Sequence, residues 1–176
     1  MFLKPTHVAA DSKGNVYVTD WERRDIQKFV PGTPYQWSLT FGGKETEDRE
    51  YGRFYKKADA YGPNGIAINS KDQIHVSDSG NCRVQVFDGQ ARFITVILGD
   101  ATLSKWGETK LDANPEMRLQ REVAQGLERE RFLRGPIGVV VDDQDRLFIV
   151  DSQRNRIQIY RKLPPYFLGR WDGGRL

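Results

Sequence analysis

Apolar and polar residues alternate along much of the chain, or apolar residues form short β-branched blocks, and both patterns are typical of β-strands. Three segments with this pattern align without a gap, at residues 5–29, 63–87 and 136–160. Each begins at a proline, reaches an aspartate fifteen residues later and ends nine residues further on at an aromatic residue. Each repeat predicts three strands, and a fourth is predicted after each by the apolar runs at 37–41, 93–98 and 166–171.

A four-residue polar turn separates the first two strands of each repeat. Its last residue is Gly14, Asp72 or Asp145, and these residue types best tolerate a left-handed backbone. Four short antiparallel strands per repeat are typical of a propeller blade. We therefore expect an all-β fold in which residues 1–176 form one β-propeller segment of three four-stranded antiparallel blades. Its expected parts are blade 1 at 5–42, a link at 43–62, blade 2 at 63–99, a helical link at 100–135 and blade 3 at 136–173.

The helical link differs in pattern from the blades. The sequence Asn-Pro-Glu at 114–116 combines a capping residue, a proline preset for the first turn and an acidic first-turn residue. Apolar residues then follow at four-residue spacing from Leu119 onward. This pattern predicts a short amphipathic helix at 115–125 and a second helix at 127–133.

The repeats resemble NHL repeats, which form the blades of β-propellers. The resemblance rests on a start of Pro-x-Gly followed by Val or Ile, and on an aspartate that closes the second strand. It rests also on a third strand that reads Arg, Ile or Val, Gln, Val or Ile, and an aromatic residue. The third strands at 83–87 and 156–160 match fully, whereas the first repeat has His7 for the early glycine and Asp25 for the arginine. The resemblance implies that the three repeats belong to a six-bladed propeller.

Composition narrows the class of protein. The chain has 176 residues, 38% of them apolar, and a net charge of +3, which is typical of a folded globular protein. The single cysteine, Cys82, excludes an internal disulfide and a cysteine-based zinc site. No apolar run approaches the length of a membrane span, and Lys4 and Pro5 interrupt the apolar start before a signal-peptide core. We therefore expect no membrane contact and, as written, a cytoplasmic chain, with an exported parent protein as the alternative.

Three blades leave a ring open, because propellers close with about four to eight blades. Each end of such an arc exposes an edge, and exposed edges recruit further strands. We therefore expect one of two arrangements. Either a second copy completes a six-bladed homodimer, or the chain is part of a longer propeller.

The aspartates that end the second strands are Asp20, Asp78 and Asp151. A carboxylate at that corner can accept backbone N–H groups of the following turn, so we interpret these residues as structural. The same interpretation covers the prolines that open each repeat, Pro5, Pro63 and Pro136. The alternative is that three carboxylates around an axis hold a cation.

Some NHL-like propellers are enzymes, so the resemblance also implies catalytic alternatives. Amidating lyases of this kind hold zinc through several histidines around the axis, but this chain has only His7 and His75. A lactonase-like propeller would hold calcium with carboxylates and asparagines such as Asn64. We assign no catalytic residue, metal ligand or cofactor, and expect zinc or calcium only if another copy or missing chain completes an enzyme site. His7, at the mouth of blade 1, is the better functional candidate of the two histidines.

The alternating strand directions place both links and the turns between strands two and three at one end of the sheets. This predicted binding face contains His7, Trp21, Arg23, Arg24, Asn64, Arg83, Trp106, Arg154 and Arg156. NHL domains in some animal regulators resemble readers of single-stranded RNA, which implies RNA binding as one alternative. However, each link holds as many acidic as basic residues, and such a face gains little from phosphate contacts. We therefore expect a non-catalytic binding or assembly module with a protein or peptide partner, and no nucleic-acid partner.

Overall fold

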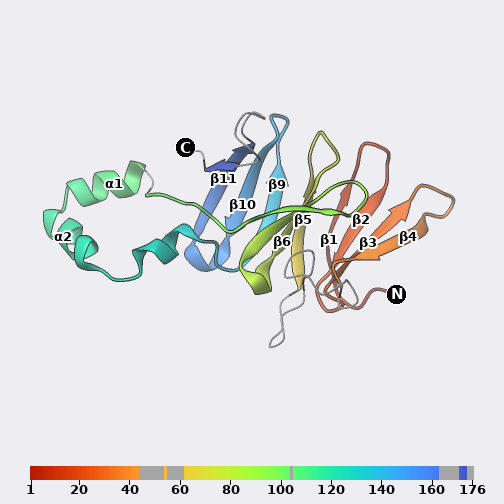
Figure 1. Ribbon diagram of the computed structural model, residues 1–176, viewed down its shortest axis with the longest axis horizontal. Coiled ribbons are helices and arrows are strands. Elements are labelled where there is room, and N and C mark those ends of the chain that lie inside the picture. Colours follow the sequence, from red (N-terminus) through yellow and green to blue (C-terminus); the bar gives the residue numbers. More distant parts are fainter. Residues whose placement is uncertain (44–53, 55–61, 104, 163–170, 174–176) are drawn as a thin grey trace.

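The computed structural model describes residues 1–43, 54, 62–103, 105–162 and 171–173. Its strands form three separate four-stranded sheets, each with its strands in chain order. Neighbouring strands within every sheet are antiparallel. The predicted all-β fold of four-stranded antiparallel blades is thus confirmed, and Figure 1 shows the sheets side by side in chain order.

The three sheets correspond to the three sequence repeats. Blade 1 consists of β1 (Pro5–Ala10), β2 (Val16–Asp20), β3 (Asp25–Val30) and β4 (Gln36–Phe41). Blade 2 consists of β5 (Pro63–Ile68), β6 (Ile74–Asp78), β7 (Arg83–Phe87) and β8 (Phe93–Ile97). Blade 3 consists of β9 (Pro136–Val141), β10 (Arg146–Asp151), β11 (Arg156–Lys162) and β12 (Trp171–Gly173). The 3-10 helices η1 (Ser79–Asn81) and η3 (Ser152–Arg154) join the second and third strands of blades 2 and 3.

Two predicted segments fall partly outside the described residues. The strand predicted at 166–171 overlaps β12 only at Trp171, and residues 166–170 are not among those described. Of the first link, predicted at 43–62, the structure describes 43, 54 and 62. Phe54 is fully buried there, and its N–H donates to the carbonyl of Gly42 at 2.8 Å.

The turn between the first and second strands has the predicted backbone. Gly14, Asp72 and Asp145 have φ angles of 78°, 56° and 57°. A second left-handed residue, which the sequence pattern did not predict, ends the turn between the second and third strands in each blade, at Arg24, Cys82 and Asn155. Because arginine and cysteine rarely adopt this conformation, the repeated turn sets the backbone there rather than the side chain.

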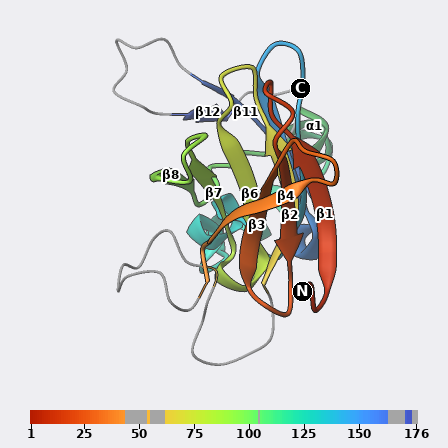
Figure 2. The same cartoon turned by 90° about the vertical axis from the view of Figure 1, so that its right-hand side faces the viewer.

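The inner strands β1, β5 and β9 lie next to one another, so that each sheet packs on the next. Figure 2 shows blade 1 in front, at one end of this stack. A Cβ atom on Gly65 would lie 2.9 Å from both the carbonyl oxygen of Ile137 and the backbone nitrogen of Val139. The early glycine of the second repeat is therefore required by the close packing of β5 on β9.

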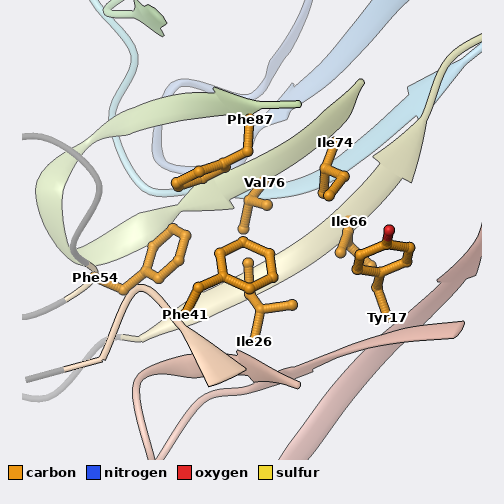
Figure 3. Packing of buried hydrophobic residues seen from close by; sticks show 8 residues of the cluster. All are labelled: Tyr17, Ile26, Phe41, Phe54, Ile66, Ile74, Val76 and Phe87. Atoms are coloured by element: carbon orange, nitrogen blue, oxygen red, sulfur yellow. The ribbon is translucent and has the colours of Figure 1, made fainter. Parts of the chain in front are cut away.

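An apolar cluster fills each junction between blades. The first joins blades 1 and 2, and Figure 3 shows its aromatic centre. There the ring of Phe87 lies 5.2 Å from that of Phe41 and 5.9 Å from that of Phe54, measured between centroids. The second cluster joins blades 2 and 3 and includes Val84 and Leu147. A blade thus buries an apolar face by packing on its neighbour.

The helical link contains α1 (Lys105–Asp112), α2 (Pro115–Val123) and the 3-10 helix η2 (Leu127–Arg131). The helix predicted at 115–125 is confirmed as α2. It ends two residues early, because Ala124 is extended and Gly126 adopts a left-handed backbone. The helix predicted at 127–133 is the shorter η2. Figure 1 shows α1 and α2 beyond the blade 3 end of the stack.

The sequence pattern missed α1, which contains Gly107 and lacks a helical repeat of apolar residues. The predicted cap was also wrong in detail. Asn114 precedes α2, but its side chain donates to the carbonyl of Lys110 in α1, at 2.8 Å, and does not cap α2. Among the residues described, no helix is long and apolar enough to cross a membrane.

Candidate functional site

The aspartates interpreted as structural are fully buried where the second strand of each blade ends. Asp20 accepts four backbone N–H groups. Those of Leu3 (2.7 Å) and Lys4 (3.0 Å) precede β1, and those of Glu22 (3.2 Å) and Arg23 (3.1 Å) belong to the turn after β2. The carboxylate therefore joins the start of blade 1 to the turn after β2. Bonding to that turn is what the sequence predicted.

In blades 2 and 3 the same carboxylate binds side chains of the third strand. Asp78 accepts from Nε of Arg83 at 2.7 Å and from Nε2 of Gln85 at 3.0 Å. Asp151 repeats these bonds, at 2.8 and 3.1 Å, with the arginine and glutamine of β11. The arginine and glutamine of the repeat pattern are thus partners of its aspartate. Blade 1 differs because Asp25 stands where the arginine is expected.

The different partners shift the pKa values of these carboxyls in opposite directions. Burial acts to raise the pKa of Asp20, but its backbone donors hold it below the ordinary value. Burial raises the pKa of Asp78 despite the opposing charge of Arg83. Burial likewise raises the pKa of Asp25, against the effect of Arg23, whose Nε lies 3.0 Å away. Among the described residues, no three His, Cys, Asp or Glu side chains are grouped to hold a metal ion.

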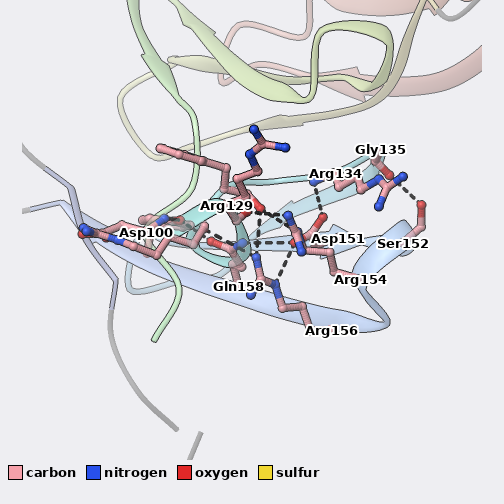
Figure 4. Close-up of polar contacts among 12 residues, drawn as sticks. Asp100, Arg129, Arg134, Gly135, Asp151, Ser152, Arg154, Arg156 and Gln158 are labelled. Carbon is pink, nitrogen blue, oxygen red and sulfur yellow. Dashed lines mark hydrogen bonds and ion pairs between the residues drawn. The ribbon is translucent and has the colours of Figure 1, made fainter. Parts of the chain in front are cut away.

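The end of blade 3 at which β10 turns into β11 also forms hydrogen bonds with the helical link (Figure 4). Arg154 donates from Nε to the carbonyl of Phe132 at 3.0 Å and from Nη2 to the carbonyl of Arg129. Arg156 donates to the same carbonyl of Phe132 at 3.0 Å. These two predicted binding residues are therefore engaged within the chain, and they fix the end of the helical link to the blade.

Four other predicted binding residues lie at the same end of blades 1 and 2. Trp21 is half-buried, with Nζ of Lys4 4.3 Å from its ring centroid. Arg24 is half-buried in the same turn as Trp21 and Arg23. Asn64, in β5, donates from Nδ2 to the hydroxyl of Ser79 at 2.9 Å. His7, in β1, is exposed.

The helical link presents large apolar side chains to solvent. Trp106 in α1 is 72% exposed, and in α2 Leu119 is 65% and Val123 77% exposed. No residue of α1 or α2 is buried, and the structure describes every residue of both helices. Leu119 and Val123 are four residues apart and share one face of α2. Of the predicted binding residues, Trp106 alone lies on the helical link. The others lie in the blades, near the turns between the second and third strands.

Polar contacts between blades were not found by sequence reasoning. Ser12 donates to the carboxylate of Asp72 in blade 2, from its N–H at 2.9 Å and its hydroxyl at 2.7 Å. Ser70 repeats both bonds with Asp145 of blade 3, at 3.0 and 2.6 Å. A signal existed in the aligned turns, where the serine recurs in blades 1 and 2 and the aspartate in blades 2 and 3. We call this pair the serine–aspartate contact.

Four-stranded antiparallel sheets that pack on one another through their inner strands define the class of protein as a β-propeller, of which three blades are present. The model of the NHL repeat family matches residues 61–87 and 133–160, within the second and third repeats. The chain therefore contains NHL repeats at these two sites. The matched residues leave out the first repeat, where His7 and Asp25 depart from the pattern.

Two curated proteins are similar to this chain over part of their length. It is 25% identical over 116 residues to the B-box type zinc finger protein ncl-1 of Caenorhabditis elegans. It is 24% identical over 121 residues to Protein brain tumor of Drosophila melanogaster. Each match covers 56% of this chain, but only 14% and 11% of the respective relative. The chain therefore spans a small part of either protein.

Among solved structures, the chain is similar to virginiamycin B lyase from Staphylococcus aureus. One such structure is of a catalytically inactive variant with quinupristin, and another is of the selenomethionine-substituted protein. Each alignment covers 98% of this chain and 41% of the lyase, with a TM-score of 0.51 and 12% identity. This likeness shows the fold alone.

Proposed function

We propose that this NHL-repeat chain is a non-catalytic binding module that takes a protein or peptide partner on the helical link and the adjoining turns. One observation carries the proposal: charged side chains of the repeats bind one another, whereas large apolar side chains of the helical link face solvent. Arg83 pairs with Asp78, for example, while Val123 is 77% exposed. Exposed apolar groups that cluster on one element mark interaction surfaces.

The chemistry of the helical link favours an amphipathic partner. The two arginines of α2 are themselves paired, Arg121 with Glu130 at 2.7 Å and Arg118 with Asp112. What they leave for a partner is mainly the apolar surface of Leu119 and its neighbours. An extended or helical peptide with two or three apolar anchors and few net charges fits such a surface.

The test is a selection of random peptides displayed on phage against the natural chain. Selected peptides are then measured by calorimetry on a variant with Leu119→Asp and Val123→Asp. We expect affinity to fall by roughly ten-fold or more, because two apolar anchors are replaced by charges. Ile94→Asp, which changes an exposed residue of β8, is the matched control and should retain affinity. Peptides that bind the helical-link variant as well as the natural chain would contradict the proposal.

The competing functions are a metal-dependent lyase or lactonase and single-stranded RNA binding. Zinc or calcium bound at one ion per chain, in a sample purified without chelators, would favour the enzyme over the non-catalytic binding module. RNA binding has less support because Arg23, Arg83, Arg154 and Arg156 bond to groups of their own chain. Such arginines have fewer donors left for phosphates. Binding of a single-stranded RNA probe that falls steeply with salt would contradict this argument.

A further inference from the structure

Two faces of the blade stack have no neighbouring blade among the described residues. We call the face of a blade that packs on the next blade its trailing face, and the opposite face its leading face. The trailing face of blade 3 consists of Val140, Phe148, Val150, Ile157 and Ile159. The leading face of blade 1 consists of Val8, Ala10, Val16, Val18, Gln27 and Phe29.

The trailing face of blade 3 is a continuous apolar surface. The strand register places Phe148 between Val140 and Ile159, and it places Val150 opposite Ile157. Ile157 is 63% exposed, Val140 62% and Val150 40%. The residue of blade 2 that aligns with Ile157 is fully buried against blade 3. The face therefore has the composition of a blade junction without its partner.

The leading face of blade 1 is likewise exposed at its inner strand. Val8 is 63% exposed, whereas Ile66, at the same position of blade 2, is 4% exposed. Val16 and Val18 are half-buried, although their counterparts in blades 2 and 3 are fully buried. Phe2 packs on Phe29 at a centroid distance of 5.7 Å and covers one corner of this face. Among the larger apolar residues described on this face, Val8 is the most accessible to another blade.

Compared with the same positions in the other blades, the trailing face of blade 3 has larger side chains and the leading face of blade 1 has smaller ones. On the trailing face of blade 3, Val140 stands where blades 1 and 2 have alanine, and Val150 stands where they have threonine and serine. On the leading face of blade 1, Ala10 stands where the other blades have isoleucine and valine, and Val16 where they have isoleucine and leucine. A larger face packed on a smaller one keeps the volume of a junction constant, and interiors tolerate such exchanges best.

At the two open faces, both the serine and the aspartate of the serine–aspartate contact are replaced by other residues. At the trailing side of blade 3, Asp143 takes the place of the serine. At the leading side of blade 1, Gly14 takes the place of the aspartate. An aspartate at 14 would bring a second carboxylate against Asp143, and like charges in contact repel. Gly14 is therefore matched to Asp143, although blades 1 and 3 are not neighbours in the stack of described strands.

We propose that the trailing face of blade 3 binds the leading face of blade 1 of a second copy of this chain. The second copy is favoured over an unrelated blade because the matched changes in size and charge lie on the two open faces of one sequence. Two copies supply six blades, and two identical junctions close the ring about a two-fold axis. The inference is independent of the partner proposed for the helical link.

The first test is the mass in solution by light scattering. The natural chain should have about twice its mass of 20.2 kDa. Ile157→Glu places a charge in the junction but changes an exposed residue of the single chain, so it should yield folded monomer. Val123→Glu, an equally exposed change on the helical link, should leave the dimer intact. A natural chain that stays monomeric at its highest soluble concentration, a series of larger open assemblies, or a dimer that survives Ile157→Glu would each overturn the proposal.

The second test installs the missing contact. A Cβ at Gly14 would meet only Cγ of Pro31, at an ordinary 3.5 Å, and Asp72 and Asp145 already adopt the same positive φ. Gly14→Asp combined with Asp143→Ser should lower the dissociation constant of the dimer by roughly a hundred-fold, because each of the two junctions gains a hydrogen-bonded charge worth about ten-fold. Gly14→Asp alone should raise it. Equal effects of the single and the double change would contradict the pairing.

The two proposals fail separately. Ile157→Glu leaves the helical link unchanged, so selected peptides should bind the monomeric variant as well as they bind the dimer. Loss of peptide binding in the monomer would show that the peptides recognise the junction instead. Leu119→Asp with Val123→Asp should remove peptide binding and leave the mass at that of two copies.

Discussion

The three blades and the helical link are held by different interactions. In the blades, side chains such as Ile74 and Leu147 are fully buried in the two junctions, and each such side chain contributes about 1.5–3 kcal/mol. In the helical link no residue of α1 or α2 is buried, and surface ion pairs such as Arg121 with Glu130 contribute about 0–1 kcal/mol each. Stability therefore comes from the blades, whereas the helices leave apolar side chains exposed to solvent.

The base of the helical link belongs with the blades. Leu133 is 3% exposed within the second cluster, and its N–H donates to the carbonyl of Leu98 at 2.8 Å. The N–H of Arg134 donates to Asp151 at 2.6 Å. The boundary between the two regions therefore lies within the link, between the exposed helices and Leu133.

The largest expected effect follows from removal of a buried carboxylate in a blade. Asp78→Ala leaves Arg83 buried without its counter-charge, which should lower the free energy of unfolding by about 3–5 kcal/mol. The measurement is urea denaturation followed by circular dichroism. Asp112→Ala is the matched control, because its pair with Arg118 lies at the surface and should contribute about 1 kcal/mol or less. Equal losses of unfolding free energy in both variants would contradict the larger contribution expected of the buried ion pair.

A smaller effect is expected at the closest approach of two blades. Gly65→Ala places a Cβ 2.9 Å from backbone atoms of β9, so the strands must move apart. The expected loss is about 1–3 kcal/mol in the free energy of unfolding. Gly89→Ala is the control, since its Cβ would lie at an ordinary 3.6 Å from the carbonyl oxygen of Asp72. If Gly65→Ala is as stable as this control, the inner strands do not pack as described.

The serine–aspartate contact predicts a pH dependence. Bonds from Ser70 hold the pKa of Asp145 below its ordinary value of 3.8, so the contact stabilises the folded chain above that pH. The stabilisation is lost as pH falls through the lower folded value. Ser70→Ala should therefore lose about 1 kcal/mol at neutral pH and nothing in strong acid. Denaturation at several pH values measures this, with Ser38→Ala, an exposed serine of β4, as the control. A difference that persists in strong acid would contradict the role of the carboxylate.

The smallest effect is expected in the helical link. Leu119→Asp with Val123→Asp changes two exposed side chains and should alter the free energy of unfolding by less than about 0.5 kcal/mol. The midpoint of thermal unfolding, compared with that of the natural chain, checks this. A loss comparable to that of Gly65→Ala would mean that α2 packs on a blade.

Strands, first turns and α2 could be predicted because each depends on a local pattern. Alternation marks the strands, and the recurring Gly14, Asp72 and Asp145 mark the left-handed turns. The helix α1 could not be predicted, since its stabilising contacts, such as the ion pair of Asp112 with Arg118 of α2, join two helices rather than repeat along one.

The candidate site was less accessible to sequence reasoning. Arg83 and Arg156 were expected on a binding face because they follow the turns between strands two and three, but each reaches back to the aspartate of its own blade. The sequence shows that the arginine and the aspartate both recur in the second and third repeats. The bond between them depends on the turn that brings them together. Open ends of the three-blade arc were predicted from the number of repeats, but the residues of the open face around Ile157 are known only from the strand register and the exposed fractions.

The most direct test of the difference between blades and helical link is amide hydrogen exchange of the natural chain. The amides of β6 and β10 should exchange only through global unfolding, because these strands are central in their sheets. Those of α1 and α2 should exchange orders of magnitude faster, through local opening of helices that bury nothing. Protection of α1 and α2 equal to that of β6 would contradict the account, since the helices would then be part of the folded core.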